Sequence, residues 1–166
     1  SVKQVINLNN DALQRLAEIS GLTELQSTEM VSWTGQRLGN VRTAFRGETF
    51  VSRAVRSPAM RGCPVCLRDD ALDQPEPLRA MIMRGDWHVR GVDICIKHRH
   101  PLVVLWRSAN LFQRYDIGTR LSEVLPELVS GRFEQPDVEP SAYDFWLSKR
   151  FENGLDNTAL AKYSVF

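Results

Sequence analysis

Cys63-Pro64-Val65-Cys66 is followed, after 28 residues, by Cys95-Ile96-Lys97-His98, which gives the pattern C-x2-C-x28-C-x2-H. Two residues between ligands let both side chains of one tight knuckle converge on a single ion, and two such knuckles supply the four corners of a tetrahedron. Every cysteine of the chain belongs to this pattern. We therefore predict one structural Zn²⁺ site, with the ligands Cys63, Cys66, Cys95 and His98.

Two other histidines could take the place of His98 as the fourth ligand. His100 would give a C-x4-H knuckle, which is an acceptable spacing. His88 follows Trp87 in a stretch that alternates as a short strand would. The pattern favours His98, and a histidine that is not a ligand is expected to form a hydrogen bond at the surface or beside the metal site.

Other chemistry fits the cysteines and acids less well. A redox-active Cys-x-x-Cys pair needs a βαβ context, which is missing around Cys63, and it would leave the second knuckle unexplained. A catalytic zinc needs an open position for water, whereas four candidate ligands close the coordination sphere.

We expect Asp69 and Asp70 to be solvated loop charges. Because the sequence has no nucleophile elbow, phosphate-binding loop or dinucleotide motif, we predict no enzymatic activity.

The composition is that of a globular protein. The 166 residues are 43% hydrophobic and 25% charged, with a formal net charge of +1, so a hydrophobic core is expected. No apolar run approaches the roughly 18 to 20 residues that span a bilayer, which argues against a membrane protein. Three cysteines cannot form a closed set of disulfides. We therefore expect the reducing cytoplasm.

The charges are segregated along the chain. Residues 37–68 carry seven arginines against Glu48, a net charge of +6, whereas residues 69–86 and 108–166 are net acidic. The planar guanidinium suits phosphate recognition better than a point charge does. The alternative is that these arginines lie on a solvated face or pair with the acidic segment. We predict phosphate contacts by Arg42, Arg46, Arg53 and Arg56.

Residues 1–56 are predicted to form a helical N-terminal region. Cap-forming residues, apolar residues at helical spacing and a final Gly21 predict a helix over residues 11–20. Thr23 and Gln26 have the spacing of a capping box, in which each side chain satisfies a backbone donor of the other, so a second helix should begin there.

The two helices partly match a helix-turn-helix. Ser27 lies where an apolar residue is usual, so two ordinary packed helices are an equal alternative. Residues 42–55 are expected to be irregular or a short strand. The residues expected to be buried between the crossing helices are Leu16, Leu22 and Met30.

The rest of the chain predicts a small β unit followed by helices, and hence an α+β fold. Residues 57–107 have the prolines and short alternating stretches of a zinc-ribbon-like β module. Within residues 108–166 we predict a helix over 119–129, kinked or ended by Pro126, and a helix capped by Ser141 after a linker. The residues of this last helix expected to face a core are Phe145, Trp146, Leu147 and Phe151.

Several parts of the chain resemble the bacterial TniQ family. Its members typically carry an Arg-x-Cys-Pro-x-Cys-Leu knuckle, as at residues 61–67, and a tryptophan before the second knuckle, as at Trp87. The second knuckle continues as Cys-x-x-His-x-x-Pro-Leu, as at residues 95–102. Residues 142–151 and 8–31 also look like the family's later helix and its helical N-terminal part.

The resemblance implies a transposition accessory protein that selects DNA target sites, in some systems by coupling a targeting complex to an AAA+ regulator of the transposase. It implies no catalysis, and it matches Cys63, Cys66, Cys95 and His98 to the family's zinc positions. Two departures stand out. Many relatives have a second Cys-x-x-Cys finger, but residues 102–115 contain no cysteine. The chain also resembles a fragment, because it begins inside the family's N-terminal part and ends before its last helices.

Together these features predict a zinc-stabilised module that binds DNA or a DNA-bound assembly during target-site selection. Its expected partners are DNA and other transposition proteins, with no small-molecule substrate and no membrane. The alternative is an adaptor that docks another protein without touching nucleic acid. Such an adaptor would expose an apolar patch rather than an arginine-lined surface.

Overall fold

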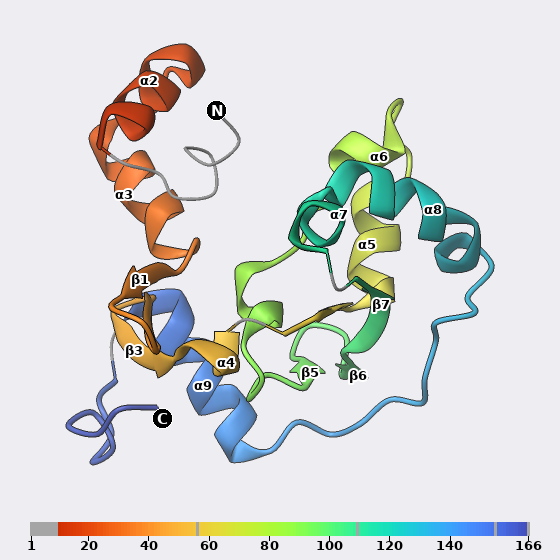
Figure 1. The fold of residues 1–166 in the computed structure, drawn as a ribbon. Helices are drawn as coiled ribbons and strands as arrows, with labels where there is room; N and C mark the ends of the chain where they lie inside the picture. Colours follow the sequence, from red (N-terminus) through yellow and green to blue (C-terminus); the bar gives the residue numbers. More distant parts are fainter. Residues whose placement is uncertain (1–9, 56, 109, 155, 166) are drawn as a thin grey trace. The chain divides into compact units, whose positions relative to one another are not determined.

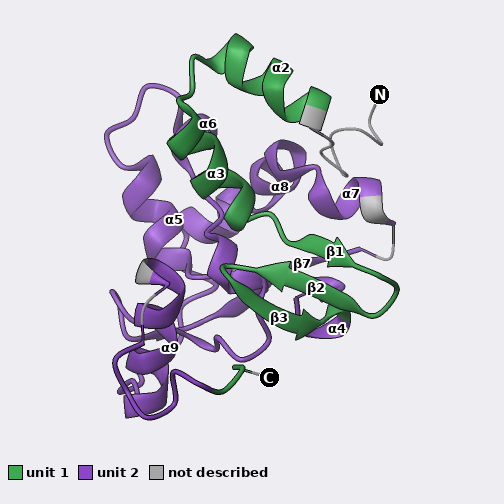
Figure 2. Ribbon diagram, turned by 90° about the vertical axis from the view of Figure 1, so that its left-hand side faces the viewer, with its two compact units in different colours: residues 1–52, 163–166 green, residues 53–162 purple. Residues whose placement is uncertain are grey.

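The computed structural model describes residues 10–55, 57–108, 110–154 and 156–165. The chain divides into two compact units, coloured separately in Figure 2: unit 1 comprises residues 1–52 and 163–166, and unit 2 comprises residues 53–162. Both helices and sheets are present, with helices at the N-terminal and C-terminal ends, so the predicted α+β class is confirmed. The division into regions 1–56, 57–107 and 108–166 stays a prediction.

Unit 1 begins with the two predicted helices and continues into a small sheet. Both halves of the capping box are present at the start of the second helix, where Thr23 and Gln26 bond to each other's backbone. The strands form an antiparallel meander in the order β1-β2-β3. The elements are α2 (Asn10–Ser20), α3 (Glu24–Ser32), β1 (Gln36–Leu38), β2 (Arg42–Phe45) and β3 (Glu48–Val51).

The β2–β3 hairpin occupies most of the stretch that was expected to be irregular or a short strand. Arg46 and Gly47 both have positive φ, 50° and 78°, which is the backbone of the two-residue turn that best fits the twist of a hairpin. Thr43 pairs with Phe50 across the strands, and both are buried. One face of the sheet therefore forms the core of unit 1.

The predicted helix-turn-helix is not confirmed. A sheet follows the helix pair, and none of Leu16, Leu22 and Met30 is buried. Leu16 is 37% exposed, and α3 contains no buried residue. The apolar spacing of these helices does not produce a dry interface between them.

Unit 2 contains two strand pairs and several short helices (Figure 1). Antiparallel pairs join β4 to β7 and β5 to β6. The strands are β4 (Ala59–Gly62), β5 (Ile94–Cys95), β6 (His100–Pro101) and β7 (Val103–Arg107). The helices are α4 (Ser52–Val55, which spans the unit boundary), α5 (Pro64–Ala71), α6 (Pro77–Ala80), the 3₁₀ helix η1 (Gly85–His88), α7 (Leu111–Tyr115), α8 (Ile117–Val129) and α9 (Ala142–Asn153).

The core of unit 2 gathers residues from the strands, α5, η1 and α8 around the cysteines. Trp87, 3% exposed, lies against Gly62, where an added Cβ would come within 2.9 Å of both the indole and Leu105. Only glycine fits this close approach. The strand expected at residues 87–89 is wrong, because Trp87 and His88 form the end of η1.

Two C-terminal helices lie close to their predicted positions. α8 continues through Pro126, and α9 begins at a capping box between Ser141 and Asp144. Leu147 and Phe151 are buried as predicted, whereas Phe145 is 45% exposed. No helix of the described residues is long and apolar enough to cross a membrane.

The linker between α8 and α9 is attached to the β5–β6 hairpin. The backbone N–H of Val138 donates to the Arg99 carbonyl at 2.7 Å, and the N–H of Gln135 donates to Nε2 of His100 at 2.9 Å. Glu139 pairs with Arg99 at 2.8 Å. These bonds hold an otherwise extended segment in place.

Candidate metal centre

The first knuckle is built by the start of α5. Cys63 is the N-cap residue of the helix and has an extended backbone, with Pro64 in the first turn, as expected for a residue before proline. The backbone N–H of Cys66 donates to Cys63 Sγ at 3.5 Å. The turn therefore places both sulfurs on one side.

The second knuckle is built by the β5–β6 hairpin. Cys95 ends β5 and pairs with His100 on β6, and Arg99 between them has a positive φ of 51°. This tight reversal brings the ring of His98 back toward the cysteine sulfurs. Cys63, Cys66 and Cys95 are all buried.

The four donor atoms have the spacing of one tetrahedral metal site. Nδ1 of His98 lies 3.6, 3.2 and 3.7 Å from the sulfurs of Cys63, Cys66 and Cys95, and the Cys66 and Cys95 sulfurs are 3.6 Å apart. Metal–sulfur bonds of about 2.3 Å and metal–nitrogen bonds of about 2.0 Å give tetrahedral edges of roughly 3.5–3.8 Å. The four predicted residues therefore form a cluster that could hold a metal ion.

The two alternative histidines are placed elsewhere. His100 is 2% exposed and uses both ring nitrogens: Nδ1 donates to the Pro101 carbonyl at 2.6 Å, and Nε2 accepts from Gln135. His88 lies outside the cluster, and burial lowers its pKa. Of the three histidines in the sequence, His98 is the one grouped with the cysteines.

A carboxylate and an ammonium support His98 from the outside. With Nδ1 facing the sulfurs, Nε2 carries the proton and donates to Asp69 Oδ2 at 3.0 Å, and Lys97 Nζ donates to the same oxygen at 3.0 Å. The bond from Lys97 lowers the pKa of Asp69. Metal-binding histidines commonly have such a carboxylate partner, which fixes the tautomer and the ring orientation.

The prediction that both acids are solvated loop charges is wrong for Asp70 and incomplete for Asp69. Asp70 accepts two bonds from Arg84, at 2.6 and 2.8 Å, and one from the N–H of Ile82. Both acids lie on α5. Asp69 follows Cys66 by three residues, a spacing that places them on neighbouring parts of a helix surface, so the sequence did contain a signal for its role.

The thiols affect one another because they are so close. Hydrogen bonds from Cys63 and Cys66 lower the pKa of Cys95 to about 2. Hydrogen bonding with the other cysteines and burial raise the pKa of Cys66. Hydrogen bonds from the neighbouring cysteines thus favour the thiolate of Cys95. All three cysteines can be thiolates together only when a cation is bound between them.

The predicted phosphate-binding arginines have different environments. Arg42 on β2 and Arg53 on α4 are exposed, and Arg56 lies outside the described residues. The side chain of Arg46 is 7% exposed and pairs with Glu29 at 2.7 Å. Its guanidinium lies 4.3 Å from the centre of the Trp33 ring. Arg46 therefore connects α3 to the β2–β3 hairpin, and its phosphate contact stays a prediction.

Most cations of unit 2 are neutralised by a carboxylate. The pairs include Arg61–Asp93, Arg68–Glu134, Arg79–Glu76, Arg84–Asp70, Lys97–Asp69 and Arg99–Glu139. Within the described parts of the chain, the arginines without an ion pair include Arg42 of unit 1 and Arg53, Arg90 and Arg107 of unit 2. The N–H of Arg90 donates to the carbonyl of Ala54 at 2.8 Å, so the backbone of Arg90 lies next to that of Arg53.

The fold and the cluster define a small module in which two knuckles bring together four residues that could hold one metal ion. The family model described as TniQ matches residues 2–102, a range that includes all four clustered residues. The chain therefore belongs to the TniQ family, which implies a role related to transposition. Searches of curated proteins and of solved structures each return no significant match.

Proposed function

We propose that the ion held by the cluster is Zn²⁺ and that its role is structural. Three thiolates and one imidazole at tetrahedral spacing form a donor set typical of structural zinc. Four protein ligands leave no position for a water molecule, and the cysteines are buried in the core of unit 2. Bound zinc would join α5 to the β5–β6 hairpin.

Asp69→Asn is expected to weaken zinc binding by about 10- to 100-fold, because the supporting carboxylate orients His98 and increases its basicity. Competition between the full chain and a chromogenic chelator measures the affinity. The matched control is Asp73→Asn, an exposed residue with φ of 56°, a conformation that asparagine tolerates. Equal affinities of the two variants would contradict the role given to Asp69.

We propose that the chain binds DNA or a DNA-bound assembly during the selection of transposition target sites. The observation that carries this proposal is the set of arginines without a carboxylate partner, set among cations that are mostly paired. An arginine already paired with an acid contributes little net attraction to phosphate, whereas an unpaired one keeps its full charge. Membership in a transposition family supports the same assignment.

The proposed partners are DNA and other transposition proteins, such as an AAA+ regulator or a targeting complex, in the cytoplasm. The chain would act by binding, without catalysing a reaction. The zinc site contributes by folding unit 2, which carries Arg53, Arg90 and Arg107.

Replacing Arg42 and Arg53 together by alanine is expected to weaken DNA binding at all sequences and to reduce the slope of log K against log salt by about 2. Titration of labelled duplex DNA at several salt concentrations measures both quantities. In the matched control, Arg79 and Arg132 are replaced by alanine. Both are exposed, but they are paired with Glu76 and Glu127. If the two double variants behave alike, the unpaired arginines are not the contact.

Arg46 also has a structural role in unit 1. Because it bonds to Glu29 and stacks on Trp33, Arg46→Ala is expected to loosen unit 1. A loss of DNA binding in that variant would not identify a phosphate contact.

A protein adaptor is the second candidate function, and one observation favours it. Ile19 on α2 and Leu25 on α3 are 86% and 80% exposed, which is unusual for large apolar side chains. Under this alternative the wild-type chain would not bind duplex DNA even at low salt.

A further inference from the structure

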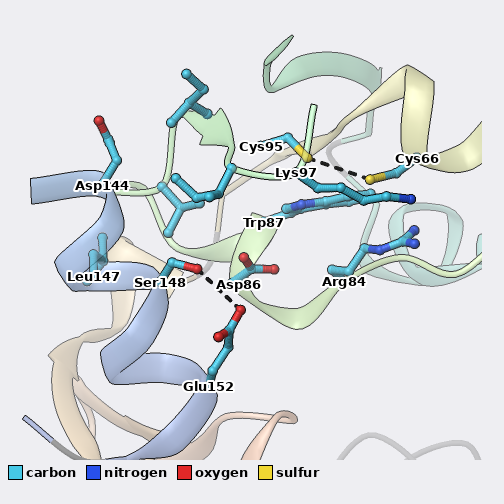
Figure 3. A pocket seen from close by; sticks show the side chains of 13 residues that line it. Cys66, Arg84, Asp86, Trp87, Cys95, Lys97, Asp144, Leu147, Ser148 and Glu152 are labelled. Atoms are coloured by element: carbon cyan, nitrogen blue, oxygen red, sulfur yellow. Dashed lines mark hydrogen bonds between the residues drawn. The ribbon is translucent and has the colours of Figure 1, made fainter. Parts of the chain in front are cut away.

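A cleft beside the metal centre lies between α9 and the segment from η1 to the β5–β6 hairpin (Figure 3). All of its lining residues belong to unit 2. Its volume is about 190 Å³, which is enough for a long side chain. The apolar lining comes from Trp87, Val92, Ile94, Ile96 and Leu147.

Carboxylates from two elements border this apolar lining. Asp144 and Glu152 come from α9, and Asp86 comes from η1. Figure 3 shows Asp86 near Ser148 and Glu152, with the Ser148 hydroxyl donating to Glu152 at 3.4 Å. The cleft thus combines a surface for an aliphatic chain with acids at one side.

The two cations of the cleft are already occupied by other acids. Arg84 forms its two-bond pair with Asp70 and lies 5.1 Å from the centre of the Trp87 ring. Lys97 donates to Asp69. Neither forms an ion pair with an acid of the cleft, whose lining has three carboxylates and two cations.

Asp86 is a largely buried acid of this cleft. Burial raises its pKa to about 6, and the backbone N–H groups of Asp86 and Trp87 and the charge of Arg84 offset only part of this rise. No cation of the described residues lies within ion-pair distance of it. A cation arriving from outside would remove this unfavourable burial of an unpaired charge.

We propose that this cleft binds an arginine side chain of a partner protein. Its methylene stem would lie along the apolar lining beside Leu147, and its guanidinium would reach Asp86 and Glu152. Arginine fits better than lysine because its planar, weakly hydrated head can bond to two carboxylates. The acids would repel a phosphate backbone, so the site goes beyond the proposed DNA contact and does not depend on it.

An NMR titration of the zinc-loaded full chain with N-acetyl-arginine amide tests this proposal. We expect shifts in the methyl signals of Ile94, Ile96 and Leu147 and in the indole signal of Trp87. N-acetyl-citrulline amide, which has the same shape without the charge, should bind about tenfold more weakly, the ratio given by one ion pair worth about 1.4 kcal/mol. N-acetyl-lysine amide should fall between the two.

Two variants connect the binding to the acids. Asp86→Asn and Glu152→Gln should each reduce the affinity for the arginine probe, while Asp73→Asn on the same unit should not. Glu152 lies on the exposed surface of α9, so its variant keeps the test valid if Asp86→Asn fails to fold. Equal binding of the arginine and citrulline probes, or unchanged affinity in Glu152→Gln, would overturn the proposal.

Discussion

Replacing His98 by alanine is expected to remove the zinc and to unfold unit 2. Structural zinc contributes about 10–16 kcal/mol in zinc-finger peptides, which is comparable to the whole free energy of unfolding of a domain, about 5–15 kcal/mol. Loss of one ligand also leaves three close thiols without a complete coordination sphere. Zinc content by elemental analysis and thermal unfolding followed by circular dichroism measure the result.

His100→Ala is the matched control for this prediction. His100 is buried and forms two hydrogen bonds with the backbone, so its loss should lower the free energy of unfolding by about 1–3 kcal/mol. The variant should still bind one zinc per chain. If His100→Ala loses the metal while His98→Ala keeps it, the fourth ligand has been assigned wrongly.

Trp87→Ala is expected to lower the free energy of unfolding of unit 2 by about 3–5 kcal/mol, the range for removing a large buried aromatic side chain. Trp87 is 3% exposed and contacts the core cluster that contains the cysteines. Denaturant unfolding of the zinc-loaded chain measures the change.

The contact between Trp87 and Gly62 predicts a coupling between two variants. Gly62→Ala alone should cost about 1–3 kcal/mol, because its methyl group would lie 2.9 Å from the indole and from Leu105. In the Trp87→Ala background the same substitution should cost less, because part of that space is vacated. Strictly additive effects would contradict the packing described here.

The metal cluster and the helix starts could be predicted because their signals are local. The two knuckles require only a tight turn with ligands two residues apart. The capping boxes at Thr23 and Ser141 require only residues three positions apart. Each motif is completed within one short segment, so its geometry follows directly from its spacing.

Features that depend on distant residues could not be predicted in the same way. The sequence around Arg46 predicts an exposed side chain. In the structure Arg46 donates to Glu29 of α3 and lies over the ring of Trp33 at the end of that helix. Asp70 accepts a hydrogen bond from Arg84, which lies fourteen residues further along the chain. The apolar spacing of Leu16 and Met30 predicted a buried interface, but spacing shows only that residues share a face of a helix, not that another element covers it.

X-ray absorption at the zinc edge on the full chain measures the coordination sphere itself. The structure predicts three sulfur atoms at about 2.3 Å and one nitrogen at about 2.0 Å, with no oxygen neighbour. Fewer than three sulfurs, or a water oxygen in the sphere, would contradict a closed structural site formed by Cys63, Cys66, Cys95 and His98.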